Sequence, residues 1–159
     1  MNTRSIPFVF FALLVSCVIS VSAQKSESPT PPKFDAALAQ KVGADEYGMR
    51  NYVLVILKTG PTRVPDGKDR DAMFAGHFAN MKRLAGEGKL ALAGPLDGVD
   101  GWRGLFVLAV ADIEDAKKLV ATDPVIIKGE MIAEYHKYYG SAALMLVNDA
   151  SEKIAKKSF

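Results

Sequence analysis

The sequence predicts an α+β fold whose elements follow the order β-α-β-β-α-β, the split arrangement of a ferredoxin-like sandwich. Three observations lead to this prediction. Segments rich in β-branched residues alternate in this order with two segments of helical periodicity. The first helical segment ends in glycines and is followed at once by a short apolar strand. The first and third expected strands are apolar on both faces, so both faces of the sheet need a cover.

Residues 1–23 are expected to be a signal peptide rather than part of the fold. Arg4 supplies the basic start, and an apolar run reaches to Val21. Val21-Ser22-Ala23 places small residues where a signal peptidase needs them. We therefore expect cleavage before Gln24 and an exported protein, periplasmic or secreted.

The alternative is a lipoprotein, because Leu14-Val15-Ser16-Cys17 fits a lipobox and would anchor the chain to a membrane through a lipid on Cys17. Cys17 is the only cysteine of the 159 residues. A chain beginning at Gln24 therefore has no thiol for disulfides, thiolate catalysis or metal binding.

Composition and charge exclude some classes of partner. Hydrophobic residues make up 49% of the chain, ample for one core, and the net charge at pH 7 is +2. Without a basic run the chain has no electrostatic reason to bind nucleic acid. No glycine pattern resembles a phosphate-binding loop, and no cofactor is expected.

Residues 24–49 are expected to be a linker. Its first part, Gln24–Pro32, is polar and rich in proline, which is typical of a disordered tether. In Lys33–Val42, apolar residues recur at helical spacing and Gly43 follows, so a short helix is expected there.

Residues 50–140 are expected to form the folded domain, and residues 141–159 a helical, lysine-rich tail. The expected strands are Arg50–Lys58, Lys89–Gly94, Leu105–Val110 and Met131–Tyr139. The expected helices are Asp69–Glu87, capped by Asp69 or Asp71, and a second one capped by Asp112. Glycine-rich turns occupy Thr59–Lys68 and Pro95–Gly104.

The first helix carries the histidine of greatest interest. Phe74, Phe78, Met81 and Ala85 form one apolar stripe at 3.6 residues per turn. His77 lies on the flank of this stripe, so its side chain should face whatever the helix covers. It is either a core-edge histidine satisfied by one hydrogen bond or a functional group with a useful proton.

The apolar second face of the sheet predicts a further contact. Tyr52, Leu54 and Ile56 point away from the face on which Val53 and Val55 lie. Since the two helices can cover only one face, a second copy of the sheet is the economical cover, which gives a two-fold homodimer. The linker helix or the C-terminal tail can cover part of this face instead.

Several segments together resemble the YCII-related family of small proteins of the dimeric α+β barrel class. The resemblance runs from about Tyr52 to Tyr139. It rests on YVLVILKTGP, on GHFANMKRLAGEGKLALAGP with His77, on Arg103-Gly104, on DIEDAKKLVATDP and on EYHKYYG. Each piece is weak by itself, whereas their order and spacing are specific for the family.

The resemblance implies a ferredoxin-like fold, dimerisation and a pocket in which His77 lies near Asp123. Some relatives are associated with dehydrochlorination of hydroxylated aromatic rings, and most have no assigned reaction. In such a pair the carboxylate orients the imidazole and stabilises its charged form. Asp123-Pro124 is also the expected N-cap and N1 pair of a short helix, and both roles can coexist.

Other candidates for a binding site lie outside this pair. His136 alternates with Glu134 and Tyr138 on one face of the last strand, and Trp102 and Arg103 lie in a turn that can cover a pocket. Two histidines and Glu134 can in principle ligate a metal. Because the chain has no close ligand pair such as HxH or HExxH, no metal site is expected.

Two functions are therefore predicted. The first is an exported small-molecule enzyme of the lyase or isomerase type, acting on a small apolar or aromatic molecule with His77 as acid or base. The second is a non-catalytic dimer that binds a small ligand or has a structural role. Unlike the usual short cytosolic relatives, this chain carries a leader, a tether and a charged tail, so their metabolic roles do not transfer directly.

Overall fold

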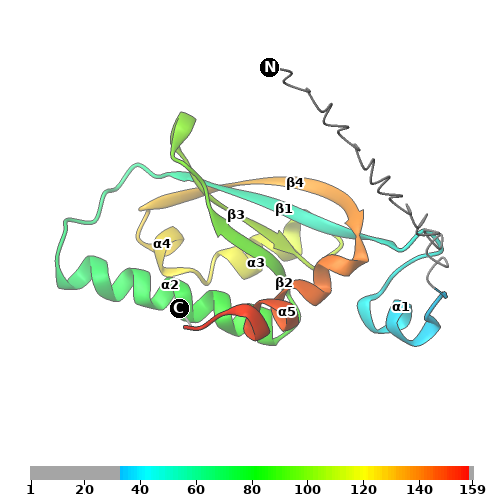
Figure 1. Cartoon of the computed structure of the whole chain (residues 1–159). Helices are drawn as coiled ribbons and strands as arrows, with labels where there is room; N and C mark the ends of the chain where they lie inside the picture. Colours follow the sequence, from blue (N-terminus) through cyan, green and yellow to red (C-terminus); the bar gives the residue numbers. More distant parts are fainter. Residues whose placement is uncertain (1–32, 158–159) are drawn as a thin grey trace, which may run out of the picture. The chain divides into compact units, whose positions relative to one another are not determined.

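The computed structural model describes residues 33–157 (Figure 1). The predicted signal peptide, the lipobox and the tether Gln24–Pro32 lie outside the described residues. The elements in chain order are α1 (Ala36–Val42), β1 (Met49–Thr59), α2 (Lys68–Gly86), β2 (Leu90–Pro95), η1 (Val99–Gly101), β3 (Trp102–Leu108), α3 (Ile113–Val120), α4 (Pro124–Ile127), β4 (Met131–Ser141), η2 (Ala142–Leu146) and α5 (Val147–Ile154). No helix within residues 33–157 is long and apolar enough to cross a membrane.

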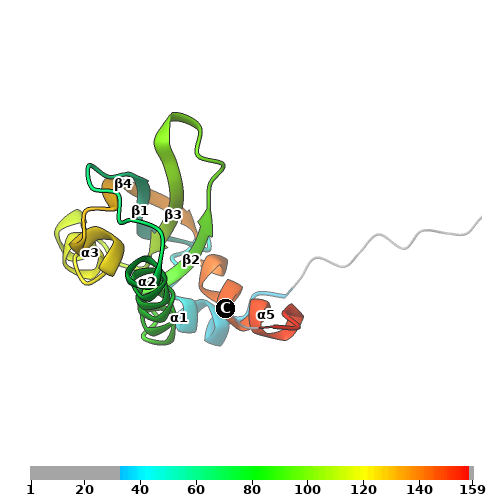
Figure 2. The same ribbon diagram turned by 90° about the vertical axis from the view of Figure 1, so that its left-hand side faces the viewer.

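The four strands form one antiparallel sheet in the order β2-β3-β1-β4. The helices α2 and α3 lie on the same side of this sheet (Figures 1 and 2). This is the α+β, ferredoxin-like arrangement that the sequence predicts. The central strand β1 pairs Val55 with Phe106 of β3 on one side and with Tyr135 of β4 on the other.

The main core lies between the sheet and the helices. Alternate residues of β1 point into it, because successive side chains of a strand face opposite sides. Its buried members are Val53, Val55, Leu57, Met73, Leu84, Leu90, Phe106, Leu108, Ala116, Val120, Val125 and Met131. Each fully buried aliphatic side chain contributes about 1.5–3 kcal/mol, so this layer holds the helices on the sheet.

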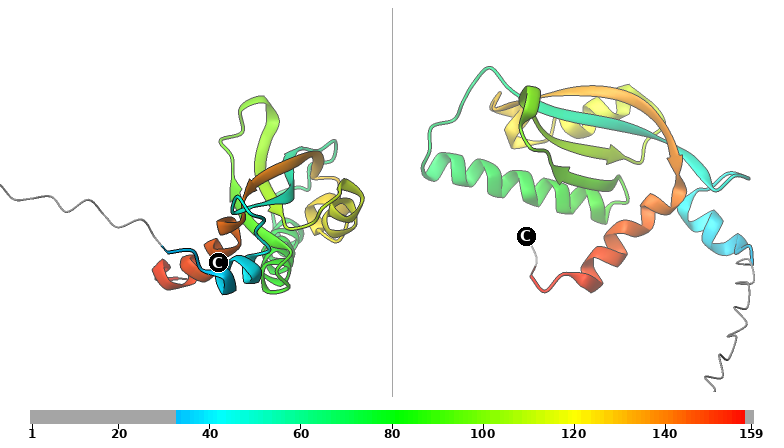
Figure 3. Two further views of the ribbon diagram at one scale, coloured as in Figure 1. Left: turned by 90° about the vertical axis from the view of Figure 1, so that its right-hand side faces the viewer. Right: turned by 45° about the horizontal axis from the view of Figure 1, so that its top comes forward.

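A smaller cluster covers part of the second face. Tyr52, Ala91 and Val107 are buried there, and Leu144 and Met145 of η2 pack against them. Figure 3 shows the chain leaving β4 and continuing through η2 beside α1. The C-terminal segment therefore covers part of the face, which was one of the two expected alternatives to a second sheet. Ile132 and Tyr138 on β4 remain 49% and 39% exposed.

Two local predictions are wrong at element ends. The N-cap of α2 is Gly67, which makes no side-chain cap, and Asp69 and Asp71 lie inside the first turn, where they favour the helix through its dipole. The third strand begins at Trp102 rather than Leu105. Trp102 is in the sheet because it pairs with Lys58 across an irregularity in the β1–β3 register, a pairing that the glycine-rich sequence around it does not indicate.

Other caps are confirmed. Asp112 accepts a hydrogen bond from the Asp115 backbone N–H at the start of α3, and Gly43 ends α1 in the left-handed conformation. Asp123 caps α4 and Pro124 follows it as the first helical residue.

The loop between β1 and α2 is tied to the start of β4. The Gly60 N–H donates to the Glu130 carbonyl at 2.8 Å, and the Thr62 N–H donates to the Gly129 carbonyl at 3.1 Å. A Cβ on Gly60 would meet the Gly129 carbonyl oxygen at 2.1 Å. Only glycine therefore allows this approach of two backbones.

We expect Gly60→Ala to lower the free energy of unfolding by about 1–3 kcal/mol, the range for overpacking a filled site. Gly86→Ala is the matched control, because a Cβ there meets nothing within 4 Å and alanine favours a helix by about 1 kcal/mol. Urea unfolding followed by circular dichroism measures both. Equal stability of the two variants would contradict the packing described for Gly60.

Candidate functional site

His77 lies on the side of α2 that faces the sheet and is 8% exposed. Three aromatic rings surround it: Phe74 at 6.3 Å edge-on, Phe78 at 5.5 Å and Phe106 of β3 at 6.0 Å in a stacked arrangement. The imidazole thus lies in an apolar, aromatic environment at the edge of the core.

The Asp123 carboxylate lies against the same ring. His77 Nδ1 is 2.8 Å from Oδ2 and 2.9 Å from Oδ1 of Asp123. Because a carboxylate can only accept hydrogen bonds, Nδ1 carries the hydrogen and Nε2 is left for other partners. The structure therefore brings together the two residues that the family resemblance pairs.

Asp123 also caps α4, since its Oδ1 accepts the Val125 backbone N–H at 3.1 Å. Its side chain is completely buried. The capping role and the contact with His77 coexist, one of the two outcomes that the sequence left open. A close approach of the helices makes this possible: a Cβ on Gly76 would meet Pro124 Cγ at 3.0 Å.

A polar chain extends from this pair to the surface. Asn80 Nδ2 lies 3.5 Å from Asp123 Oδ2, and Asn80 Oδ1 accepts hydrogen bonds from Arg83 at 2.7 Å and from the Thr122 hydroxyl at 3.1 Å. Asn80 is one helical turn after His77 and is 9% exposed. Asn80 is not among the residues predicted from the sequence, although its position at i+3 from His77 is a usable signal.

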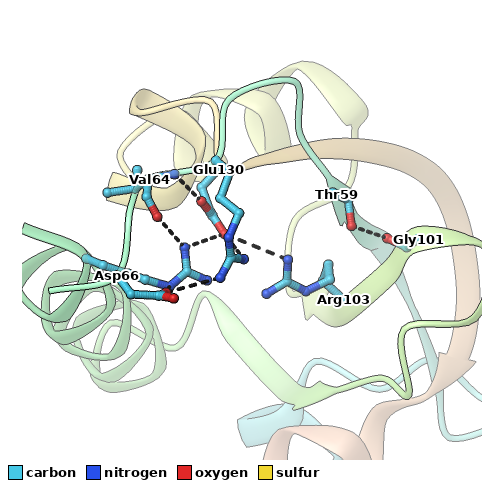
Figure 4. A network of polar contacts seen from close by, with 8 residues as sticks. Thr59, Val64, Asp66, Gly101, Arg103 and Glu130 are labelled. Atoms are coloured by element: carbon cyan, nitrogen blue, oxygen red, sulfur yellow. Dashed lines mark hydrogen bonds and ion pairs between the residues drawn. The ribbon is translucent and has the colours of Figure 1, made fainter.

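A second buried carboxylate organises the other end of α2. Glu130 is 2% exposed and accepts the Val64 backbone N–H at 2.8 Å. Its Oε1 lies 2.8 Å from Arg70 Nη1, 3.8 Å from Arg103 and 3.9 Å from Arg63. Figure 4 shows Arg103 directed toward Glu130 from β3 while Val64 reaches it from the loop.

The pKa of Glu130 is lowered from its ordinary value of 4.5 by the balance of two effects. Burial raises the pKa, because it disfavours the charged form. The Val64 N–H, the Arg70 hydrogen bond and the positive charges of Arg70 and Arg63 lower it, and together they outweigh burial. The sequence gives no signal for this cluster, because its members come from four separate segments.

The remaining candidates lie apart from His77. His136 and Tyr138 pair with Leu54 and Tyr52 of β1 and share their face, the one away from the helices. His136 Nε2 contacts Glu134 Oε1 at 2.8 Å, and Tyr138 stacks on Tyr52 at 6.0 Å. Within residues 33–157, no group of three or more His, Cys, Asp or Glu side chains is suited to hold a metal ion.

Of the two expected turn residues, Trp102 is 41% exposed at the start of β3. Arg103 joins the Glu130 cluster instead, through the 3.8 Å ion pair. The structure therefore divides the sequence-predicted residues among the His77–Asp123 pair, the Glu130 cluster and the opposite face of the sheet.

The fold and the paired helix histidine define a ferredoxin-like α+β protein with a candidate acid–base site. Residues 51–136 match the family model of the YCII-related domain. This match spans more than half of the chain, and the protein belongs to the YCII-related family. No curated protein matches the chain.

Glu130 should make the free energy of unfolding depend on pH in the acid range. Because its folded pKa is depressed, its contribution is present above the ordinary value of 4.5 and is lost as pH falls through the folded pKa. We expect Glu130→Gln to lower the free energy of unfolding by about 3 kcal/mol at pH 7, since one partner of a buried pair is removed. We also expect it to weaken the fall of this free energy with decreasing pH in the acid range.

Unfolding in urea at pH 7 and at points below pH 4.5 measures this effect. Glu114→Gln is the control, because Glu114 is exposed and forms an ion pair with the exposed Lys117, a contact worth less than about 1 kcal/mol. An unchanged fall of the free energy of unfolding in the acid range in Glu130→Gln would contradict the assignment.

Proposed function

We propose that this YCII-related protein is an exported small-molecule enzyme of the lyase or isomerase type, with His77 as acid–base and Asp123 as its orienting partner. The observation that carries the proposal is the contact of His77 Nδ1 with both oxygens of a completely buried carboxylate, at 2.8 and 2.9 Å. A base–orienter pair of this kind is the usual arrangement for proton transfer.

The roles of the two residues follow from the geometry. Asp123 holds the ring in the tautomer that leaves Nε2 as the acceptor, and stabilises the imidazolium that forms. Nε2 takes a proton from the substrate, and the electron pair left behind expels a leaving group or shifts a double bond. The proton returns to solvent or to the product from the same nitrogen.

The surroundings favour an apolar or aromatic substrate. Phe74, Phe78 and Phe106 present rings to His77 at 5.5–6.3 Å, and aromatic rings pack against such surfaces in stacked or edge-on geometry. A hydroxylated, halogenated ring, for which the family resemblance gives a precedent, is the first substrate class to test.

The test is a panel of chlorinated hydroquinols and related phenols, with chloride release and mass spectrometry as readouts. We expect turnover, and a loss of about 100- to 10,000-fold in kcat for His77→Gln, the range for a general acid–base group. Asp123→Asn should lower kcat with little change in KM, because it misorients the ring rather than removing substrate contacts.

His136→Gln is the matched control, since His136 is a histidine on the opposite face of the sheet and should leave kcat unchanged. A reaction that proceeds equally well in His77→Gln would refute the catalytic role of the pair.

The second candidate is a non-catalytic protein that binds a small ligand or has a structural role. The observation favouring it is that Asp123 already serves as the N-cap of α4 and that His77 is only 8% exposed. Under this alternative, Asp123→Asn lowers stability and no member of the substrate panel is converted.

We also propose that the protein is a homodimer through the exposed part of the second sheet face. Ile132 is 49% exposed there, and the η2 segment covers only the part near Tyr52, Ala91 and Val107. An antiparallel sheet that leaves apolar side chains uncovered is suited to pack on a second sheet.

Analytical ultracentrifugation tests the dimer. We expect a dimer that Ile132→Asp converts to monomer, because a charge would be buried at the interface. Ile154→Asp is the control, since Ile154 is 82% exposed on α5. A monomeric parent protein would contradict the proposal.

Export is a further part of the proposal and rests on the sequence of residues 1–23. N-terminal sequencing of the processed protein from its natural host should give Gln24 as the first residue. A lipid-modified Cys17 would identify the lipoprotein alternative.

A further inference from the structure

We infer that Arg63 and Arg103 form a binding site for an oxyanion, a carboxylate carried by the substrate, at the Glu130 end of α2. The inference rests on the proposed function only in that the rest of the substrate is taken to lie along α2 toward His77. Charges and distances at the Glu130 cluster support the anion site itself.

The structural work of this cluster is done by Arg70 and Glu130. Arg70 Nη1 lies 2.8 Å from Glu130 Oε1 and donates to the Val64 carbonyl at 3.0 Å, while Glu130 accepts the Val64 N–H. These short contacts hold the β1–α2 loop against the start of α2 and of β4. One arginine is sufficient for this purpose.

Arg63 and Arg103 add positive charge that this structural role does not require. Both approach the same oxygen, Glu130 Oε1, but stop at 3.9 and 3.8 Å, beyond hydrogen-bond distance. Their side chains are 63% and 28% exposed. Asp66 forms ion pairs with Arg63 and Arg70. The cluster therefore contains three arginines and two carboxylates, which leaves one positive charge in excess.

Arg63 and Arg70 each donate a side-chain hydrogen bond to a group of the cluster, whereas Arg103 is held by charge alone. In the described part of the chain, its contact with Glu130 is an ion pair without a hydrogen bond, and a guanidinium has five N–H donors. It comes from β3, whereas Arg63 comes from the loop before α2, so the two groups converge from separate elements. A planar guanidinium matches the two oxygens of a carboxylate.

The cluster adjoins the His77 site along one face of α2. The Arg70 guanidinium lies 4.8 Å from the centre of the Phe74 ring, and that ring contacts His77 edge-on at 6.3 Å. Arg70 and His77 are seven residues apart on one helix, about 10 Å along its axis. The span from Arg70 to His77 is comparable to the length of an aromatic ring with a short acidic side chain.

The experiment measures binding of 3-phenylpropionate to the purified protein by calorimetry and by NMR of the arginine Nε–H groups. We expect binding that weakens as salt is raised, with shifts at Arg103 and at the His77 ring. The neutral analogue 3-phenylpropionamide should bind at least about tenfold more weakly, since it lacks the charge that strengthens hydrogen bonds to arginine.

Arg103→Gln should weaken binding of the carboxylate about tenfold or more and remove the preference over the amide. Arg63→Gln changes a side chain that is 63% exposed and should weaken carboxylate binding in the same direction. Circular dichroism of this variant checks that it remains folded. Lys117→Gln is the matched control, because it removes one positive charge from α3, where Lys117 pairs with Glu114.

The inference is overturned if the carboxylate does not bind, if it binds no better than the amide, or if Lys117→Gln weakens binding as much as Arg103→Gln does. Asp123→Asn separates this inference from the proposed function. Carboxylate binding that survives in Asp123→Asn would support the anion site. An unmutated protein that binds the carboxylate but converts no member of the substrate panel would refute catalysis and leave the anion site standing. Turnover of neutral substrates only, unaffected by Arg103→Gln, would do the reverse.

Discussion

The complete burial of the Asp123 carboxylate constrains the whole helical layer of this protein. Removing an ion from water costs several kcal/mol unless hydrogen bonds replace the lost hydration. Here His77, Asn80 and the Val125 N–H supply them, two from α2 and one from α4. The two helices must therefore keep their contact at Gly76 and Pro124, and the imidazole is held in one orientation as a consequence.

The sheet separates two kinds of surface. On the helix side, two buried carboxylates, Asp123 and Glu130, sit near the two ends of one aromatic stretch of α2, each with its own cationic or imidazole partners. On the other side, polar and apolar groups are more exposed, and η2 fills only part of the face. The proposed small-molecule site and the proposed dimer contact thus lie on different faces and do not compete.

Membership of the YCII-related family fixes the domain but not the reaction. The chain continues on both sides of the matched residues 51–136. The C-terminal addition is part of the fold, since Leu144 and Met145 pack on the second face and the Asn148 side chain donates to the Leu90 carbonyl at 2.7 Å. This donation satisfies a carbonyl near the edge strand β2, which protects an otherwise open edge.

The sequence by itself determined the order of the elements, the apolar character of both sheet faces, the caps at Asp112 and Asp123, and the placement of His77 on the inner flank of α2. These features are local or periodic, so residue spacing carries them. Only the tertiary structure decided the contacts of Asp123 with His77 and Asn80. The same holds for the ion pair of Arg103 with Glu130, and for the position of His136 on the sheet face away from the helices. Asp123 lies 46 positions from His77 and 43 from Asn80 along the chain. Contacts between such distant residues depend on strand register and on the close approach of helices, which no local pattern encodes.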